Sequence, residues 1–310
     1  MKKRVLVGVA LAACVTLTSV APAQAYTTDG LVLDVDARDT ASFDSSNPTV
    51  VHDISPTGLT GVVNGNVVYN ATTGAWDFGG GNSGASNIDM GPISTDFSGG
   101  ITVEFLANFG TVDGWERIID FGDVGASNNI VITRHAGNSN FLVEIWNSGV
   151  RVKTLITEDN PIVDNETAHW AITIDSDIDS TLHFYKNGVE IPTNIDGTVY
   201  TQGAPYGGLP ETTTRNHSYI GRSLWGDPEF AGSITYLRIY NRALTPTEIT
   251  ANITTDSTAA ASGGSANHRG DSRAQELAAT GFNPTPWLVS ITTLLVAGIA
   301  LRRRSTRTVR

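Results

Sequence analysis

The chain has 310 residues, with 20 basic and 31 acidic side chains and a net charge of −11. Eight of the basic residues lie at the ends, three in the first 25 residues and five beyond residue 280, which leaves 12 basic against 31 acidic residues between them. That stretch has a net charge of −19, which argues against nucleic acid as a partner, and its excess of carboxylates suits cation binding.

Residues 1–25 have the three parts of an export signal. A positive start (2–4) is followed by an apolar stretch (5–20) and by Ala23 and Ala25, the small residues of a cleavage site. We therefore expect cleavage after Ala25, so that Tyr26 begins the mature chain.

An alternative leader is a lipoprotein signal, in which Cys14 at the end of Leu-Ala-Ala-Cys would carry the lipid. Under the first reading no cysteine remains after export. The exported domain would then be stabilised by its core and not by disulfides.

Residues 26–253 are expected to form one all-β unit. Five segments alternate apolar with polar residues, the period of a half-buried strand: LVLDVDA (31–37), ITVEFLA (101–107), FLVEIW (141–146), HWAITID (169–175) and SITYLRIY (233–240). Segment 181–191 predicts a hairpin, because Asn187-Gly188 is a strong turn signal. Many short strands in one unit predict a two-sheet sandwich or jelly roll.

One short helix is expected at 245–253. Thr245 is the expected N-cap, Pro246 takes the first helical position, and Glu248 completes a capping box. Residues 254–276 are small and polar and predict a flexible spacer. Arg269-Gly270-Asp271 within it spells an adhesion tripeptide, a match short enough to arise by chance.

The end of the chain, 277–310, combines three features in order. The pentapeptide Leu277-Ala278-Ala279-Thr280-Gly281 precedes an apolar run (287–301), and a basic tail (302–310) follows, which should stay in the cytoplasm. The apolar run would span about 22 Å as a helix, less than the hydrocarbon core of about 30 Å. Its length favours a temporary stop over a permanent anchor.

This arrangement resembles the LPxTG-type sorting signal of Gram-positive surface proteins, in the LAxTG variant associated with class E sortases. Ala278 replaces the more common proline. The resemblance implies that a sortase thiolate attacks the carbonyl of Thr280 and that Gly281 leaves. An amine of the cell-wall peptidoglycan then displaces the thiolate and becomes bonded to Thr280. The alternative is an ordinary single-span membrane anchor.

Residues 219–249, YIGRSLWGDPEFAGSITYLRIYNRALTPTEI, resemble the closing segment of laminin G-like jelly rolls in the concanavalin A-like superfamily. WDFGGGNS (76–83) and WERIIDFG (115–122) also resemble segments of that family, so that the resemblance covers about 28–253. It implies adhesion, glycan binding or protein binding and, in related branches, glycoside hydrolysis. Thr235 departs from the pattern, because many relatives have an acidic residue there.

Two acidic loops are candidates for calcium, which takes six to eight oxygen ligands. Segment 120–129 offers Asp120, Asp123 and Asn128, and segment 225–230 offers Asp227 and Glu229. The alternative is that these side chains satisfy backbone donors in turns. The six histidines show no paired spacing, which does not favour zinc.

A glycosidase needs two carboxylates at a set separation. Asp34 and Asp36 alternate on one strand and share a face, but a solvated outer face accounts for them. Glu104 and Glu144 are isolated on their strands and are expected to face outward in the same way.

Tryptophan side chains could stack on sugar rings. Trp146 and Trp170 are expected in the core of the sandwich, whereas Trp225 lies in a loop beside Asp227 and is the candidate ligand contact.

The sequence therefore predicts an exported protein, attached to the cell wall, with one laminin G-like jelly roll on a flexible stalk. The predicted role is adhesion or recognition of a glycan or protein, without enzymatic activity and with calcium as a candidate aid. A secreted glycoside hydrolase and a passive structural surface protein are the alternatives.

Overall fold

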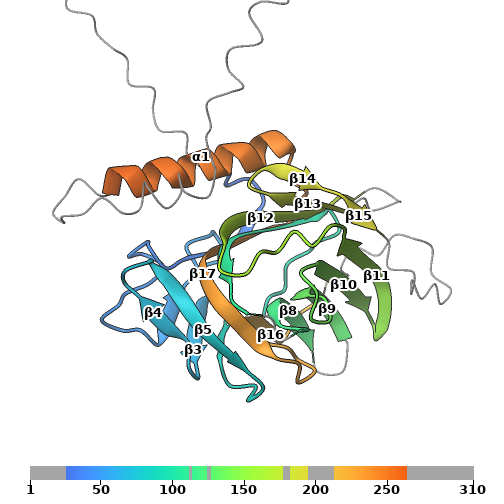
Figure 1. Ribbon diagram of the computed structural model, residues 1–310, viewed down its shortest axis with the longest axis horizontal. Coiled ribbons are helices and arrows are strands. Elements are labelled where there is room, and N and C mark those ends of the chain that lie inside the picture. Colours follow the sequence, from blue (N-terminus) through green and yellow to red (C-terminus); the bar gives the residue numbers. More distant parts are fainter. Residues whose placement is uncertain (1–25, 112–113, 124–126, 177–181, 195–212, 264–310) are drawn as a thin grey trace, which may run out of the picture.

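The computed structural model describes residues 26–111, 114–123, 127–176, 182–194 and 213–263. Within them, two antiparallel sheets pack face to face and one helix lies outside the sandwich (Figure 1). The predicted all-β, two-sheet jelly roll is confirmed.

The first sheet has β17 near its middle and α1 across its outer face. In sheet order its strands are β14 (Val189–Ile191), β13 (Leu182–Lys186), β12 (Thr167–Ile174), β7 (Ile101–Phe109), β17 (Glu229–Tyr240), β5 (Ala75–Gly81) and β4 (Val68–Asn70), and β1 (Leu31–Asp36) pairs with β17 as well.

The second sheet lies on the side of the sandwich away from α1 (Figure 1). In sheet order its strands are β15 (Thr193–Asn194), β11 (Val150–Thr157), β10 (Phe141–Asn147), β9 (Ser127–Arg134), β8 (Arg117–Asp123), β16 (His217–Ile220), β6 (Asn87–Asp89), β3 (Thr60–Asn64) and β2 (Val50–His52).

The five predicted strands and the hairpin are present. They correspond to β1, β7, β10, β12 and β17, and the hairpin joins β13 to β14. Asn187 and Gly188 have φ values of 50° and 78° at its turn, the left-handed pair that a two-residue type I′ loop requires.

The core fills the space between the sheets and is rich in aromatic rings. Phe141 and Trp170 have ring centroids 4.7 Å apart, and Phe109 lies 5.2 Å from Phe230. Trp170 is buried, as predicted.

Strand β17 is buried on both faces, and a β-bulge divides it. The register against β7 shifts between Ile234 and Tyr236, so that Ile234, Leu237 and Ile239 all reach the core despite their mixed spacing. Thr235 lies at the bulge, and its carbonyl accepts a hydrogen bond from the Ala37 N–H at 2.9 Å. Beyond the bulge, alternate side chains of β17 face α1.

Helix α1 (Pro246–Gly263) begins with the predicted capping box. Glu248 accepts from the Thr245 N–H at 2.8 Å, and the Glu248 N–H donates to Thr245 Oγ1 at 3.3 Å. The helix continues ten residues past the predicted end at Ile253, so the first part of the predicted spacer is helical.

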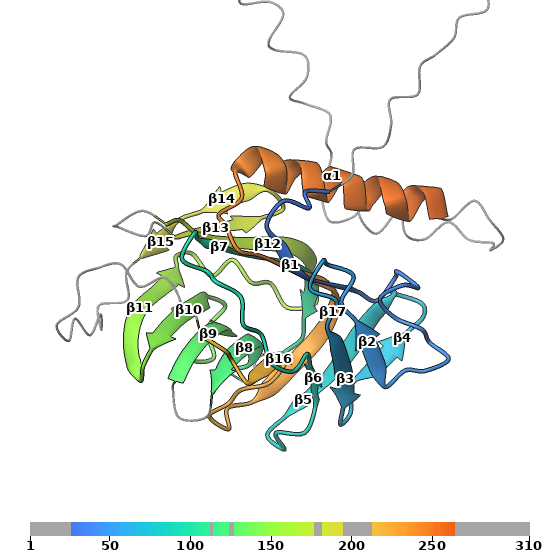
Figure 2. The same cartoon turned by 180° about the vertical axis from the view of Figure 1, so that it is seen from behind.

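Contacts with the outer face of the first sheet hold α1 both before and beyond Ile253. Ile249 and Ile253 of α1 pack with Tyr185 and Tyr240, and Asp256 of α1 pairs with Arg238 of β17. The first described residues run close to α1 before they enter β1 (Figure 2). No helix in the described ranges is long and apolar enough to cross a membrane, and the predicted apolar run 287–301 lies outside them.

Candidate functional site

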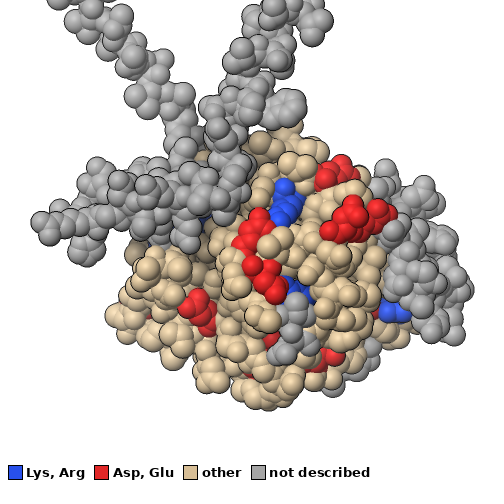
Figure 3. All heavy atoms as spheres, viewed as in Figure 1, with Lys and Arg blue, Asp and Glu red and all other residues tan. Residues whose placement is uncertain are grey.

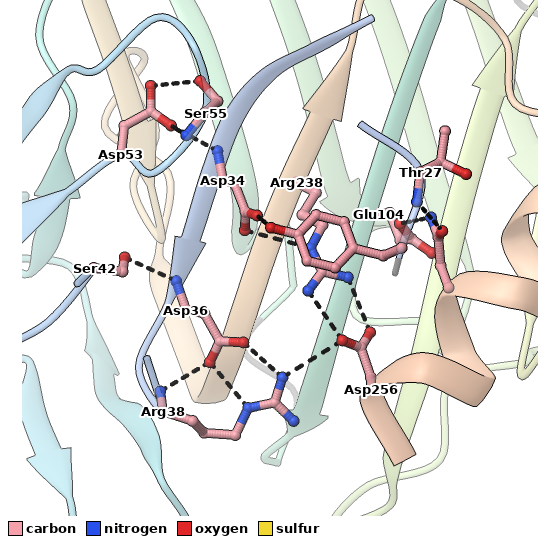
Figure 4. A network of polar contacts seen from close by, with 12 residues as sticks. Thr27, Asp34, Asp36, Arg38, Ser42, Asp53, Ser55, Glu104, Arg238 and Asp256 are labelled. Carbon is pink, nitrogen blue, oxygen red and sulfur yellow. Dashed lines mark hydrogen bonds and ion pairs between the residues drawn. The ribbon is translucent and has the colours of Figure 1, made fainter. Parts of the chain in front are cut away.

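Asp34 and Asp36 lie beneath α1, so the prediction of a solvated outer face was wrong (Figure 4). Asp34 accepts hydrogen bonds from the Tyr26 hydroxyl at 2.7 Å and from Arg238 Nε at 3.3 Å. Asp36 accepts from Arg38 Nε at 2.9 Å and Nη2 at 2.6 Å. Burial raises the pKa of Asp34 to about 6, against the opposing effect of Arg238.

Glu104 and Glu144 point away from the core, but neither is freely solvated. Glu104 is buried under α1, where it accepts from Asn252 Nδ2 at 2.8 Å and lies 2.8 Å from His169 Nε2. Glu144 is half-buried and pairs with Arg151 at 2.6 Å. All four carboxylates are therefore engaged with protein groups and form no exposed acid pair.

The candidate calcium loop at 120–129 is largely strand. Asp120 lies in β8 and accepts from Asn129 Nδ2 of β9 at 2.8 Å, while Asp123 accepts from Asn216 Nδ2 at 2.6 Å. Asn128 has a left-handed φ of 60°, and its Oδ1 accepts from the Ser148 N–H at 2.8 Å.

The second candidate calcium pair is also engaged. Asp227 forms an ion pair with Arg117 at 2.5 Å. Glu229 accepts from Ser83 Oγ at 2.6 Å and from the Ala85 N–H at 2.7 Å; although burial opposes it, this hydrogen bonding lowers the pKa of Glu229.

The described residues therefore give calcium no ready site. Among them, no three histidine, cysteine, aspartate or glutamate side chains are grouped so as to hold a metal ion. Residues 124–126 of the first loop lie outside the described ranges. Calcium binding stays a prediction, without support from the described donors.

Two tryptophans meet on the outer face of the second sheet. Trp225, in the loop between β16 and β17, has its ring centroid 5.8 Å from that of Trp146, with the planes at 43°. Trp225 is 38% exposed and Trp146 is half-buried, so the prediction of a core position for Trp146 was wrong. Alternation along β10 was the signal for it, because Phe141, Val143 and Ile145 occupy the core face.

A buried carboxylate positions the loop that carries Trp225. Asp120 Oδ2 accepts from the Leu224 N–H at 2.8 Å, and Ser223 Oγ accepts from the Trp225 N–H at 2.9 Å. Burial raises the pKa of Asp120 to about 6 despite the hydrogen bonds that it accepts from Leu224 and Asn129. Asp120, one of the predicted calcium ligands, therefore holds the loop that carries Trp225.

Ion pairs flank the two indoles. The Arg117 guanidinium carbon lies 5.8 Å from the Trp225 ring centroid, and the Arg151 carbon lies 5.8 Å from that of Trp146. Asp227 neutralises Arg117, and Glu144 neutralises Arg151. The surface is therefore an aromatic patch with locally balanced charge, suited to packing against a ligand's apolar face while polar groups bond at the rim.

The remaining predicted sites lie outside the described residues. They are the cleavage residues Ala23 and Ala25, Cys14, the tripeptide at 269–271, and the sorting pentapeptide at 277–281 with Thr280.

The sequence of residues 79–250, more than half of the chain, matches the model of the concanavalin A-like lectin/glucanases superfamily. No curated protein sequence matches the chain significantly.

Solved structures share the fold at low identity. The binding domain of botulinum neurotoxin DC in complex with SialylT has a TM-score of 0.52 at 13% identity, over 74% of this chain and 52% of that one. The same domain in complex with rat synaptotagmin II gives 0.51 at 12% identity, over 74% and 51%.

Domain 4 of an extracellular arabinanase from Geobacillus stearothermophilus, in complex with arabinotriose, gives 0.47 at 20% identity, over 72% and 98%. The chain spans about half the length of the neurotoxin domains it matches. The family match and the two-sheet architecture together show that the chain belongs to the concanavalin A-like lectin/glucanases superfamily, with a laminin G-like jelly roll.

Proposed function

We propose that this protein is an exported surface module that binds a glycan through Trp146 and Trp225. The observation that carries the proposal is the pair of indoles on the outer face of the second sheet, Trp225 exposed and Trp146 half-buried, with ring centroids 5.8 Å apart. The C–H face of a pyranose ring packs on an indole face, and neighbouring polar groups can bond its hydroxyls. The fold itself supports ligand binding in a neurotoxin domain solved with SialylT.

The charge around the patch favours a neutral glycan. Arg117 and Arg151 are both compensated by carboxylates. In the view of Figure 3, acidic side chains cover more of the surface than basic ones, and the whole chain has a net charge of −11. An anionic glycan would meet long-range repulsion and no uncompensated cation among these flanking residues.

Mutation of the two indoles tests the proposal. A glycan and matrix-protein array first identifies the neutral glycans that the wild-type protein binds. We expect Trp225→Ala and Trp146→Ala each to weaken binding of these glycans about tenfold or more, since loss of a central aromatic anchor costs about 2 kcal/mol or more. Val189→Ala, an exposed apolar change on the first sheet, is the matched control and should bind as wild type does. Wild-type affinity for these glycans in both tryptophan variants would refute the site. Binding of the wild-type protein to matrix proteins on the array, and to no glycan, would indicate a protein ligand.

The same samples separate binding from hydrolysis. A binding module leaves the reducing ends of its glycan unchanged over a long incubation. Release of new reducing ends by the intact chain would favour the glycoside hydrolase alternative, with catalytic residues other than the engaged Asp34 and Asp36.

Attachment to the envelope is the second part of the proposal. The order of pentapeptide, apolar run and basic tail supports cleavage between Thr280 and Gly281 by a sortase and transfer to peptidoglycan, after export directed by residues 1–25. Mass spectrometry of wall digests should find a chain that begins at Tyr26 and ends at Thr280. Recovery of the chain only from membranes, with its terminal arginines, would indicate a membrane anchor.

A further inference from the structure

A third tryptophan is displayed close to the proposed glycan site. Trp115 is 39% exposed and has a φ of 62°, a left-handed conformation that is costly for a bulky side chain. Its N–H donates to the Arg134 carbonyl at 3.2 Å, and its own carbonyl accepts from Arg117 Nη1 at 2.6 Å. The backbone is thus held on both sides while the indole remains accessible.

Two glycine turns support this conformation. A Cβ on Gly114 would lie 2.7 Å from the backbone nitrogen of Gly137, so the segment before Trp115 and the turn after β9 approach as closely as glycine allows. Both glycines have left-handed φ values, 69° and 76°. The Trp115 ring meets His135 edge-on, with centroids 5.1 Å apart.

The same buried guanidinium touches both tryptophan sites. Arg117 is 5% exposed, and its Nη1 donates to the Trp115 carbonyl and to Thr133 Oγ1. Its Nη2 donates to Asp227, and its guanidinium lies by the Trp225 ring. Thr133 alternates with the core residue Ile132 on β9 and so lies on the outer face of the sheet, where it is buried. His135, which contacts the Trp115 ring, directly follows the strand. Trp115 and Trp225 therefore both border the Arg117 side chain, at one end of the second sheet.

We propose that Trp115 is a second stacking position, so that the module takes an extended neutral pyranose oligosaccharide and not a single terminal sugar. This inference rests on the proposed glycan site and adds the length of its ligand. Trp146 and Trp225 hold one part of the oligosaccharide, and Trp115 holds another part. Arg117 lies between these two positions. Side-chain charges at Arg117 are balanced by Asp227, which suits a neutral ligand along this path.

A length series tests the inference. The probes are the neutral cello-, chito-, manno- and xylo-oligosaccharides from the disaccharide to the hexasaccharide, titrated calorimetrically against the full-length chain in mild detergent. We expect wild type to bind a hexasaccharide about tenfold or more tightly than its disaccharide. Trp115→Ala should remove that gain and leave disaccharide binding unchanged, Trp115→Phe should keep most of it, and Trp225→Ala should weaken both lengths.

The outcomes separate the two proposals. Wild-type affinity that does not depend on length, or a Trp115→Ala variant that keeps the full gain, overturns the extended site and leaves the Trp146–Trp225 site standing. Absence of wild-type binding across all four series overturns the neutral-glycan function and this inference with it. Equal melting temperatures of the variants and wild type exclude misfolding as the cause of a loss.

Discussion

Removal of the Asp256 carboxylate should loosen α1 from the sandwich. Arg238 is 3% exposed, and its Nη1 and Nη2 donate to Asp256 at 2.9 and 3.0 Å. After Asp256→Ala, the nearest acid would be Asp34, 3.3 Å from Nε (Figure 4). Breaking a buried ion pair on one side costs about 3–5 kcal/mol. Asp256 keeps some exposure, so we expect a loss of about 3 kcal/mol in the free energy of unfolding.

Urea denaturation followed by far-UV circular dichroism measures this loss, and limited proteolysis should show earlier cutting within α1. Asp29→Ala is the control, because Asp29 also pairs with an arginine, Arg242, but its side chain is 87% exposed. That change should cost less than about 1 kcal/mol. If Asp256→Ala unfolds within about 1 kcal/mol of wild type, the ion pair does not hold α1, and the reasoning is refuted.

Three further predictions concern titration, backbone and metal. Burial raises the pKa of Asp120 from 3.8 to about 6, so its unfavourable effect on stability grows as pH rises through this range. Asp120→Asn loses one of the two acceptors for Leu224 and Asn129 and should be less stable than wild type at pH 4, but this deficit should shrink by up to about 3 kcal/mol between pH 4 and 7 in urea titrations; a deficit that grows with pH would contradict this. Gly232→Ala should lower the free energy of unfolding by at least about 2 kcal/mol in the same assay, because the new Cβ would lie 2.1 Å from the Asn108 carbonyl oxygen at a φ of 148°; near-wild-type stability would be the contrary result. A chelator tests the predicted calcium site: a fall in the melting temperature that added calcium reverses would show the site, and an unchanged melting temperature would contradict the prediction.

Local pattern in the sequence determined the strands, the hairpin and the start of α1. Alternation, the Asn187-Gly188 turn and the Thr245–Glu248 capping box act over a few residues, so their signals are complete within the segment that forms. Alternation along β10 also determined that Trp146 faces away from the core, although tryptophans of a sandwich are generally expected in the core.

Only the tertiary structure decided what covers each outward face. Asp34 and Glu104 have the spacing of solvated residues, but both are buried beneath α1. Asn252 of α1 donates to Glu104, and Arg238 pairs with Asp34. Alternation states which side of a sheet a side chain takes and carries no information about a helix from elsewhere in the chain. The contact of Trp225 with Trp146 of β10 depends on the loop before β17, which Asp120 of β8 holds in place. Contacts between segments so far apart in the sequence are set by long-range packing and not by local propensity.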